Sequence, residues 1–265
     1  MPDMTLAADQ HLYYEEAGSG APVIFLHSAL GDLRQWDAQV HALSDQFHCI
    51  RYDLRGYGKS SSPHESFDPA MDLLSLMDHL GIVQAALVGS SLGGSVALHA
   101  ALRYPTRVTK AALLGTGIFG FAPPEVHDSA DALAEEYEAV LQSQDVDALI
   151  AFFDKLWLRG IQGDDFQVPQ AARALFWTMN EERLLQHRED DPDYGNLDDV
   201  PDLGTVSRPL LTILGQWDTD YCQKAAQHLV SHVPNVTLEL IPGTAHFPNL
   251  THPDLVSALL RNWLG

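Results

Sequence analysis

The clearest indication of the fold of this chain is the stretch Val88-Gly89-Ser90-Ser91-Leu92-Gly93-Gly94. An apolar run over 85–88 precedes it and is typical of a buried strand. A run rich in alanine and leucine follows and predicts a helix that ends before Tyr104-Pro105. A Gly-x-Ser-x-Gly motif between a strand and a helix lets the chain turn sharply, so that its central serine stands exposed above a sheet. Ser91 is therefore the candidate nucleophile.

Apolar segments alternate with helical patterns on both sides of this motif. We expect strands at 11–16, 22–27, 47–53, 85–88, 108–114, 209–215 and 236–241. We expect helices at 36–43, 67–80, 95–102, 221–231 and 253–264. Strands that alternate with helices predict an α/β fold with a doubly wound, mostly parallel sheet.

The alternation stops after Gly117. Residues 119–204 are mostly helical in pattern, with expected helices at 131–141, 146–157, 169–179 and 182–187. This segment holds 20 acidic and 5 basic residues, and so carries 15 of the 21 net negative charges. We therefore expect a core formed by 1–118 and 205–265 and a helical cap formed by 119–204. The acidic stretch 190–202 does not match the ligand spacing of an EF-hand, so no metal site is expected there.

Composition excludes several classes of function. A net charge of −21 argues against nucleic acid as a partner, because nucleic acid requires a basic face. No stretch approaches eighteen consecutive apolar residues, so no membrane span is expected. The N-terminal residues lack the basic and apolar regions of a secretory signal. Cys49 and Cys222 lie far apart with apolar neighbours, which favours two buried free thiols and a reducing, cytoplasmic location.

Three residue types that work together follow three of the expected strands. Ser91, Asp218 and His246 each come just after a strand, and ligands of open α/β sheets bind beyond the carboxyl ends of the strands. A serine hydroxyl is a poor nucleophile until an imidazole removes its proton, and a carboxylate fixes the tautomer of that imidazole. The chain order Ser, Asp, His is that of the α/β-hydrolases. These three residues are the expected catalytic triad.

Alternatives exist for two triad positions. Asp220 lies two residues after Asp218, and we expect it to cap the helix that follows rather than to orient the histidine. His252 competes with His246, but His246 lies in the turn directly after the last strand. Asp53 is expected to bond its own loop. Trp36 and Trp217 either line the substrate pocket or fill the core, and the sequence leaves that choice open.

The whole chain resembles the α/β-hydrolase superfamily. His27 at the end of a strand and the loop Tyr52–Ser60 match that superfamily, the loop through its D-x-R-G-x-G-x-S pattern. The stretches 28–37 and 245–249 resemble the 3-oxoadipate enol-lactonase branch. The resemblance implies an eight-stranded sheet and an oxyanion hole made by the backbone N–H groups of Ala29 and Leu92. Ser28 stands where most members have glycine, but backbone donors do not require glycine there.

These expectations converge on a serine hydrolase that cleaves a small carboxylic ester or lactone through an acyl-enzyme, without a cofactor or a metal. A C–C bond hydrolase, a cofactor-free perhydrolase and an acyltransferase could use the same triad, and a non-catalytic ligand-binding protein could use the same fold. The expected partner is a small molecule. The candidate pocket residues, beside the triad and the oxyanion hole, are Ser28, Trp36, Trp217, Arg159 and Arg173. The two arginines are the candidates for binding a carboxylate-bearing enol-lactone.

Overall fold

The computed structural model of this protein describes residues 3–7, 9–61, 65–123, 129–161, 168–186, 192–195 and 202–265. Eight strands form one sheet in the order β1-β2-β4-β3-β5-β6-β7-β8. The strands are β1 (Asp3–Ala7), β2 (Gln10–Ala17), β3 (Ala21–Leu26), β4 (Phe47–Tyr52), β5 (Ala85–Ser90), β6 (Val108–Leu114), β7 (Leu210–Gly215) and β8 (Val236–Ile241). β2 runs antiparallel to β1 and β4, and the other pairs are parallel. The predicted doubly wound, mostly parallel α/β fold is confirmed.

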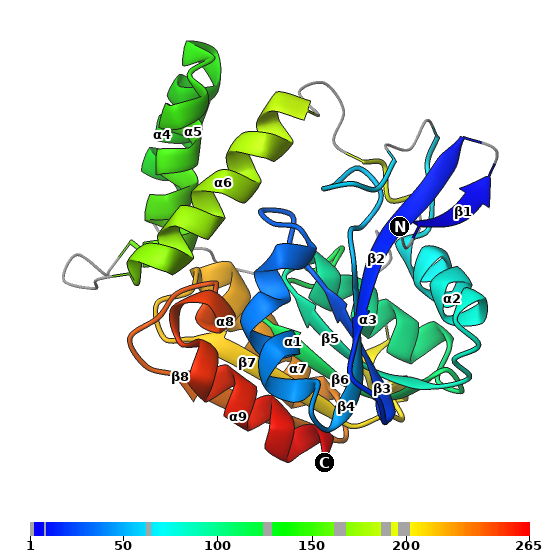
Figure 1. Cartoon of the computed structure of the whole chain (residues 1–265). Coiled ribbons are helices and arrows are strands. Elements are labelled where there is room, and N and C mark those ends of the chain that lie inside the picture. The colour runs from blue at the N-terminus through cyan, green and yellow to red at the C-terminus, as the bar shows by residue number, and fades with distance from the viewer. Residues whose placement is uncertain are drawn as a thin grey trace.

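Helices cover both faces of this sheet (Figure 1). They are α1 (Asp37–Leu43), α2 (Pro69–His79), α3 (Leu92–Arg103), α7 (Asp220–His232), α8 (Pro248–Thr251) and α9 (Pro253–Leu264), with short 3-10 helices η1 (Leu33–Trp36) and η3 (Leu203–Thr205). Along β3, Val23 and Phe25 pack with α1 and α9, whereas Ile24 and Leu26 pack with α2, α3 and α7. A strand buried on both faces has an almost continuous apolar sequence, and β3 could therefore be predicted from its sequence.

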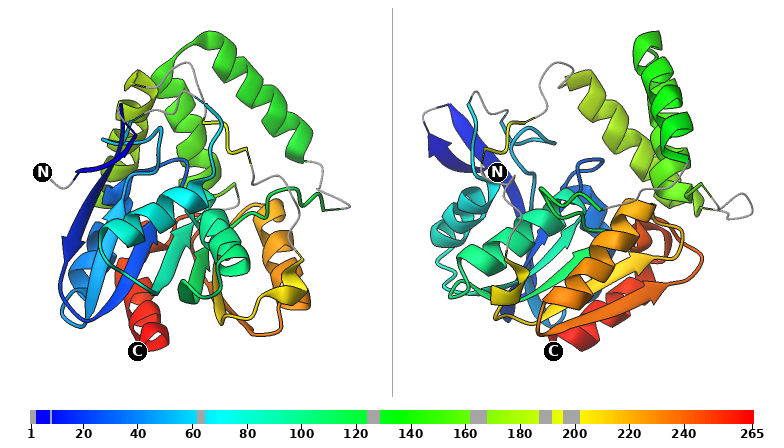
Figure 2. Two further views of the ribbon diagram at one scale, coloured as in Figure 1. Left: turned by 90° about the vertical axis from the view of Figure 1, so that its right-hand side faces the viewer. Right: turned by 180° about the vertical axis from the view of Figure 1, so that it is seen from behind.

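The segment after β6 forms a separate group of helices on the side of the sheet where the parallel strands end (Figures 1 and 2). These cap helices are α4 (Ser129–Ser143), α5 (Val146–Phe153), the π-helix η2 (Asp154–Arg159) and α6 (Gln170–Gln186). They pack through an aromatic cluster that includes Phe152, Phe153 and Phe176, and Phe247 of the core joins this cluster. The cap helices are thus attached to the core beside the turn that follows β8.

One expectation about a single element is wrong, and one strand was not expected. Helices expected at 169–179 and 182–187 are one continuous helix, α6, because nothing in the sequence between them breaks a helix. Within it, the buried Asn180 amide donates to Phe176 O at 2.8 Å and to Leu30 O of the core at 3.0 Å. The strand not expected is β1, a short strand at the edge of the sheet, and among the described strands it pairs with β2 alone.

Two remaining expectations concern a metal site in the stretch 190–202 and a membrane span. Of the acidic stretch 190–202, only 192–195 and 202 belong to the described residues, and the expectation of no metal site there lies mostly outside them. Among the described helices, none combines the length and the apolar character that crossing a bilayer requires.

Candidate functional site

Ser91 occupies a strained turn between β5 and α3. Its φ of 50° and ψ of −113° form a combination that residues with a side chain rarely adopt. The turn needs its glycines, because a Cβ on Gly89 would lie 2.3 Å from Gly93 O. A Cβ on Gly93 would lie 2.3 Å from Leu26 O. Close backbone contact on both sides thus holds the Ser91 side chain at the start of α3, as the motif predicts.

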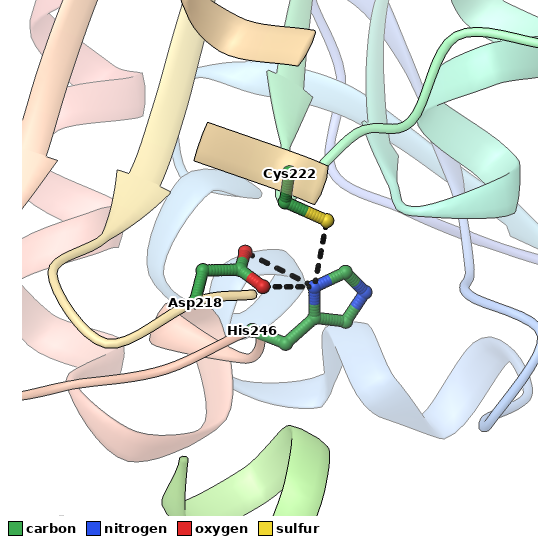
Figure 3. A group of neighbouring side chains, drawn as sticks. All are labelled: Asp218, Cys222 and His246. Atoms are coloured by element: carbon green, nitrogen blue, oxygen red, sulfur yellow. Dashed lines mark hydrogen bonds and ion pairs between the residues drawn. The ribbon is translucent and has the colours of Figure 1, made fainter. Parts of the chain in front are cut away.

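Asp218 and His246 meet at the carboxyl ends of β7 and β8 (Figure 3). The two carboxylate oxygens of Asp218 lie 2.9 and 3.0 Å from Nδ1 of His246. The Asp218 side chain is fully excluded from solvent, and 5% of the His246 side chain is exposed. The carboxylate therefore accepts the Nδ1 proton and leaves Nε2, on the other side of the ring, as the basic nitrogen.

The two rivals of this pair lie elsewhere. Asp220 is in the first turn of α7 and forms an ion pair of 2.8 Å with Lys224. The expectation that Asp220 caps this helix is wrong: Thr219 is the N-cap, and its side chain accepts from Cys222 N at 3.3 Å. The backbone explains this, because Asp220 is already helical while Thr219 has the extended ψ of 152° that a cap requires. His252 lies before α9, with Nδ1 3.1 Å from Thr251 Oγ1.

The Cys222 thiol lies beside the Asp218–His246 pair, with its sulfur near the imidazole (Figure 3). Its Sγ is 3.7 Å from His246 Nδ1 and 3.6 Å from Gly115 O. Burial, reinforced by the nearby Asp218 charge, raises the pKa of this thiol well above its usual value, so it stays protonated. Cys49 and Cys222 are both free and buried, as expected.

Among the described residues, Asp218, Cys222 and His246 form the one group of His, Cys and acidic side chains whose donor atoms lie within metal-binding distance of one another. The 2.9 Å contact between Asp218 and His246 is that of a hydrogen bond, which requires a proton on Nδ1. The spacing of this group is therefore accounted for by the carboxylate–imidazole pair.

The two expected oxyanion donors, Ala29 and Leu92, line the same cavity as the candidate nucleophile. Leu92 is the first residue of α3, so its N–H has no acceptor within that helix. Ala29 lies in the loop after β3, between residues that are held in place. Ser28 N–H donates to Gln35 Oε1 at 2.9 Å, and Leu30 N–H donates to Ser28 Oγ at 3.2 Å. Ser28 thus fastens this loop through both its backbone and its hydroxyl.

His27 also holds the loop after β3 in place. Its ring is fully buried, with Nδ1 2.7 Å from Ser28 O and Nε2 2.9 Å from Leu54 N. Burial lowers the pKa of His27 to about 4, so the ring is neutral near pH 7. A neutral imidazole donates from one nitrogen and accepts at the other, as these two contacts require. His27 therefore links the loop of Ala29 to the loop after β4.

A cavity of about 500 Å³ connects these groups. Ser91, His246, Ala29, Leu92 and Ser28 all line it. Its remaining described lining comes from both the core and the cap helices: Leu30, Tyr57, Ser95, Gly117, Ile118, Phe119, Tyr137, Phe153, Trp157, Arg183, Pro192, Tyr194, Tyr221 and Phe247. The core thus supplies the candidate reactive residues of the cavity, and the rest of its described lining is largely aromatic.

Four expected pocket residues do not line this cavity. Trp36 is fully buried under the sheet, where its ring centroid lies 5.4 Å from that of Phe25. Trp217 packs instead against the end of η2, where its Cβ lies 3.1 Å from the position of a Cβ on Gly160. Arg159 and Arg173 turn toward the buried carboxylate of Asp154, at 3.5 and 2.6 Å. An uncompensated buried carboxylate is costly, and this explains why both guanidinium groups lie beside it.

The sequence missed several lining residues. One of them, Trp157, contacts His246 directly. Its carbonyl accepts from His246 N at 3.0 Å, and its ring centroid lies 4.6 Å from that of His246. Phe247 and Tyr57 carried a signal, because one follows His246 and the other lies in the loop after β4. Trp157 and Arg183 carried none, because the packing of the cap against the core decides which helix face meets the cavity.

Known proteins resemble this chain along its whole length. A non-heme haloperoxidase from Rhodococcus erythropolis is 26% identical over 100% of this chain and 99% of its own. A 3-oxoadipate enol-lactonase from Acinetobacter baylyi is 26% identical over 95% of this chain and 92% of its own. The enol-lactonase structure from Burkholderia xenovorans LB400 matches with a TM-score of 0.78 at 21% identity over 99% of both chains, a likeness of fold alone. The profile of the alpha/beta hydrolase fold matches residues 21–253. The chain therefore belongs to the α/β-hydrolase family and is a hydrolase of that family.

Proposed function

We propose that this protein is a serine hydrolase that cleaves a small carboxylic ester or lactone. The observation that supports this most strongly is that His246, held by the buried carboxylate of Asp218 at 2.9 Å, lines the same cavity as Ser91. A carboxylate that fixes the Nδ1 proton makes Nε2 a base, and a serine on a sharp turn is a nucleophile that such a base can activate. Relatives named as an esterase, as lactonases and as haloperoxidases agree with acyl-transfer chemistry at this site.

In the proposed reaction, Ser91 Oγ attacks the carbonyl carbon while His246 Nε2 takes the hydroxyl proton. The N–H groups of Ala29 and Leu92 donate to the oxyanion that forms. His246 then gives its proton to the departing alkoxide, which leaves an acyl group on Ser91. Water, deprotonated by His246, then attacks that acyl group. The bond between the acyl carbon and Ser91 Oγ breaks, the carboxylic acid leaves, and His246 returns the proton to Ser91 Oγ. Asp218 stays ionised throughout and stabilises the imidazolium that forms at each proton transfer.

A second activity would use the same acyl-enzyme. Hydrogen peroxide in place of water would release a peracid, and a relative named as a haloperoxidase favours this possibility. Adding peroxide to an ester assay and measuring peracid against free acid separates the two outcomes. C–C bond cleavage is separated by offering a vinylogous diketone in the same assay, and a non-catalytic binding protein would turn over none of these compounds.

The test is replacement of Ser91 by alanine, with hydrolysis of p-nitrophenyl butyrate as the readout. We expect Ser91→Ala to lower kcat by about 10⁴- to 10⁶-fold while the fold is retained, because the hydroxyl contributes chemistry rather than packing. A fluorophosphonate should label the native protein on the peptide that contains Ser91.

The adjacent serine provides a matched control. Ser90 is fully buried in β5, and its Oγ has no partner among the described residues. We expect Ser90→Ala to keep kcat within a few-fold and to keep the fluorophosphonate label. A folded Ser91→Ala protein that retains most of its esterase rate would refute the proposed function.

A further inference from the structure

The π-helix η2 of the cap ends against the two loops that carry the carboxylate–imidazole pair. It continues directly from α5, and Gly160 follows it with a φ of 80°. A Cβ on Gly160 would lie 2.9 Å from Trp217 O and 3.0 Å from the Cβ of Ala245. Trp217 and Ala245 directly precede the two members of the pair in the sequence. The end of η2 therefore packs on both loops at once.

Trp157 contacts His246 from this helix. The last carbonyl groups of a helix have no partner within it, and the carbonyl of Trp157 accepts from His246 N at 3.0 Å. The indole lies against the imidazole, with ring centroids 4.6 Å apart and planes inclined by 53°. Helices of the π type are rare and often occur at functional sites. The cap thus contacts both the backbone and the side chain of the candidate catalytic base.

Other side chains contact the imidazole of His246 from the core. The carboxylate of Asp218 and the thiol of Cys222 both face Nδ1 (Figure 3). Phe247 stands edge-on to the ring, with centroids 5.1 Å apart and planes inclined by 86°. A ring that is packed on several sides keeps one orientation, because close packing excludes its other rotamers. Of these neighbours, Trp157 is the one that the cap supplies.

Charge gives the indole of Trp157 a second role. In the proposed reaction His246 becomes an imidazolium at each proton transfer. An aromatic face within about 6 Å of a cation attracts it, and tryptophan gives the strongest contact of this kind. The attraction therefore grows as His246 takes up its proton. An interaction that is stronger in the transition state than in the ground state raises kcat.

We infer that Trp157 is a positioning residue for His246: its indole holds the imidazole in one orientation and stabilises the imidazolium. Through Trp157 the cap takes part in the chemistry in addition to shaping the cavity. This inference rests on the proposed function and adds to it a residue that acts through the catalytic base.

Trp157 also lines the cavity, so the test has to separate positioning from substrate contact. We expect Trp157→Leu to lower kcat for p-nitrophenyl acetate by about 3- to 30-fold. KM should stay within a few-fold, because acylation and deacylation both use His246. Trp157→Phe should retain most of kcat, since a phenyl ring keeps an aromatic face. A role in the cavity wall alone would instead raise KM, increasingly as the acyl chain grows from acetate to octanoate.

Tryptophan fluorescence tests the contact without turnover. A protonated imidazole quenches the emission of an indole that it touches. We expect the emission of the native protein to fall as the pH is lowered from about 8 to about 5, the range in which imidazoles take up a proton. This component should be absent from Trp157→Leu, which lacks the indole, and from His246→Gln, which lacks the quencher.

Trp177 supplies the matched control. It is also a cap tryptophan, but it lies on α6, donates to Asp154 and is not among the described residues that line the cavity. We expect Trp177→Leu to keep kcat within a few-fold and to keep the quenching that depends on His246.

Three results would overturn the inference: a folded Trp157→Leu protein with the native kcat for the acetate ester, a loss confined to KM, or native emission that His246→Gln does not change. The third result decides the matter even where Trp157→Leu does not fold. The proposed function fails separately, if no ester is hydrolysed and no serine is labelled, whatever the fluorescence shows.

Discussion

Two carboxylates, one in the core and one in the cap helices, are equally buried and yet differ in their partners. The side chains of Asp218 and Asp154 are both fully excluded from solvent. Asp218 faces the imidazole of His246. Asp154 faces two guanidinium groups, and Trp177 Nε1 donates to its Oδ2 at 2.9 Å. Burial alone therefore does not separate a reactive carboxylate from a structural one.

The difference lies in what the partner can do. An imidazole gains and loses a proton near neutral pH, so the pair in the core can pass through a charged and a neutral state during a reaction. A guanidinium keeps its proton at all accessible pH values, so the pair in the cap has a single state. The first pair therefore supports the proposed catalytic role, whereas the second fastens η2 to α6.

The largest expected effect comes from the carboxylate in the core. Asp218→Asn should lower kcat by about 10⁴-fold, because an amide no longer holds the tautomer or stabilises the imidazolium. The free energy of unfolding should change little. Steady-state ester hydrolysis and urea denaturation measure the two quantities on the same preparation.

Asp220→Asn is the control for this variant, since it removes a carboxylate two residues away, in the first turn of α7, where it pairs with Lys224. It should keep kcat nearly intact and lower the unfolding free energy by roughly 1 kcal/mol or less, through its ion pair with Lys224. If Asp220→Asn were inactive and Asp218→Asn active, the orienting role would pass to Asp220.

The carboxylate in the cap should give the opposite result. Asp154→Ala should lower the free energy of unfolding by about 1–3 kcal/mol, because the half-buried Trp177 N–H loses its acceptor and two guanidinium groups lose their carboxylate. Hydrolysis of a small neutral ester should keep its kcat within a few-fold, since Asp154 does not line the cavity. Asp147→Ala, at an exposed position of α5, is the control and should be nearly neutral. A loss of kcat comparable to that of Asp218→Asn would remove the contrast between the two carboxylates.

A third buried carboxylate, that of Asp53, is expected to make the stability of the protein depend on pH. Asp53 accepts from Leu33 N and Lys59 N, both at 2.8 Å, and burial raises its pKa to about 7 from 3.8. Between these values the folded protein holds more protons than the unfolded chain, so this group makes stability fall as pH rises from about 4 to about 7. Below that window its contribution is constant.

We expect Asp53→Asn to remove this contribution, which amounts to at most one proton, or ~1.4 kcal/mol per pH unit. Unfolding free energies measured by urea between pH 4 and pH 7 should therefore fall less steeply for the variant than for the native protein. Asp37→Asn, in which an exposed carboxylate is removed, should leave the native slope unchanged. Equal slopes for the native protein and Asp53→Asn would show that Asp53 is ionised throughout.

Much of the core was predictable because buried parallel strands have a legible sequence. The apolar runs of β3 to β7 fix where these strands end, and the residues just after those ends include Ser91 and Asp218, while His246 lies in the turn after β8. The edge strand β1 escaped notice, since its only partner is β2 and its sequence lacks an apolar run. The general rule is that positions set by local sequence were predictable and positions set by packing were not.

The cap shows the other side of this rule. Its helices follow from periodicity, but which of their side chains reach the cavity depends on how they pack on the core. Arg159 and Arg173 were expected in the pocket because they are rare cations in an acidic segment, and Asp154 engages both. Arg183, ten residues after Arg173 in α6, lines the cavity although nothing in its sequence context distinguishes it.

The backbone conformation of Ser91 affects any attempt to raise the thermal stability of this protein. Its φ of 50° carries about 1–3 kcal/mol of strain, which glycine would relieve at a cost of roughly 0.5–1 kcal/mol in chain entropy. Ser91→Gly therefore raises thermal stability and abolishes the hydroxyl in one step. A laboratory selection for heat resistance alone would enrich inactive clones, so retained turnover has to be part of every round.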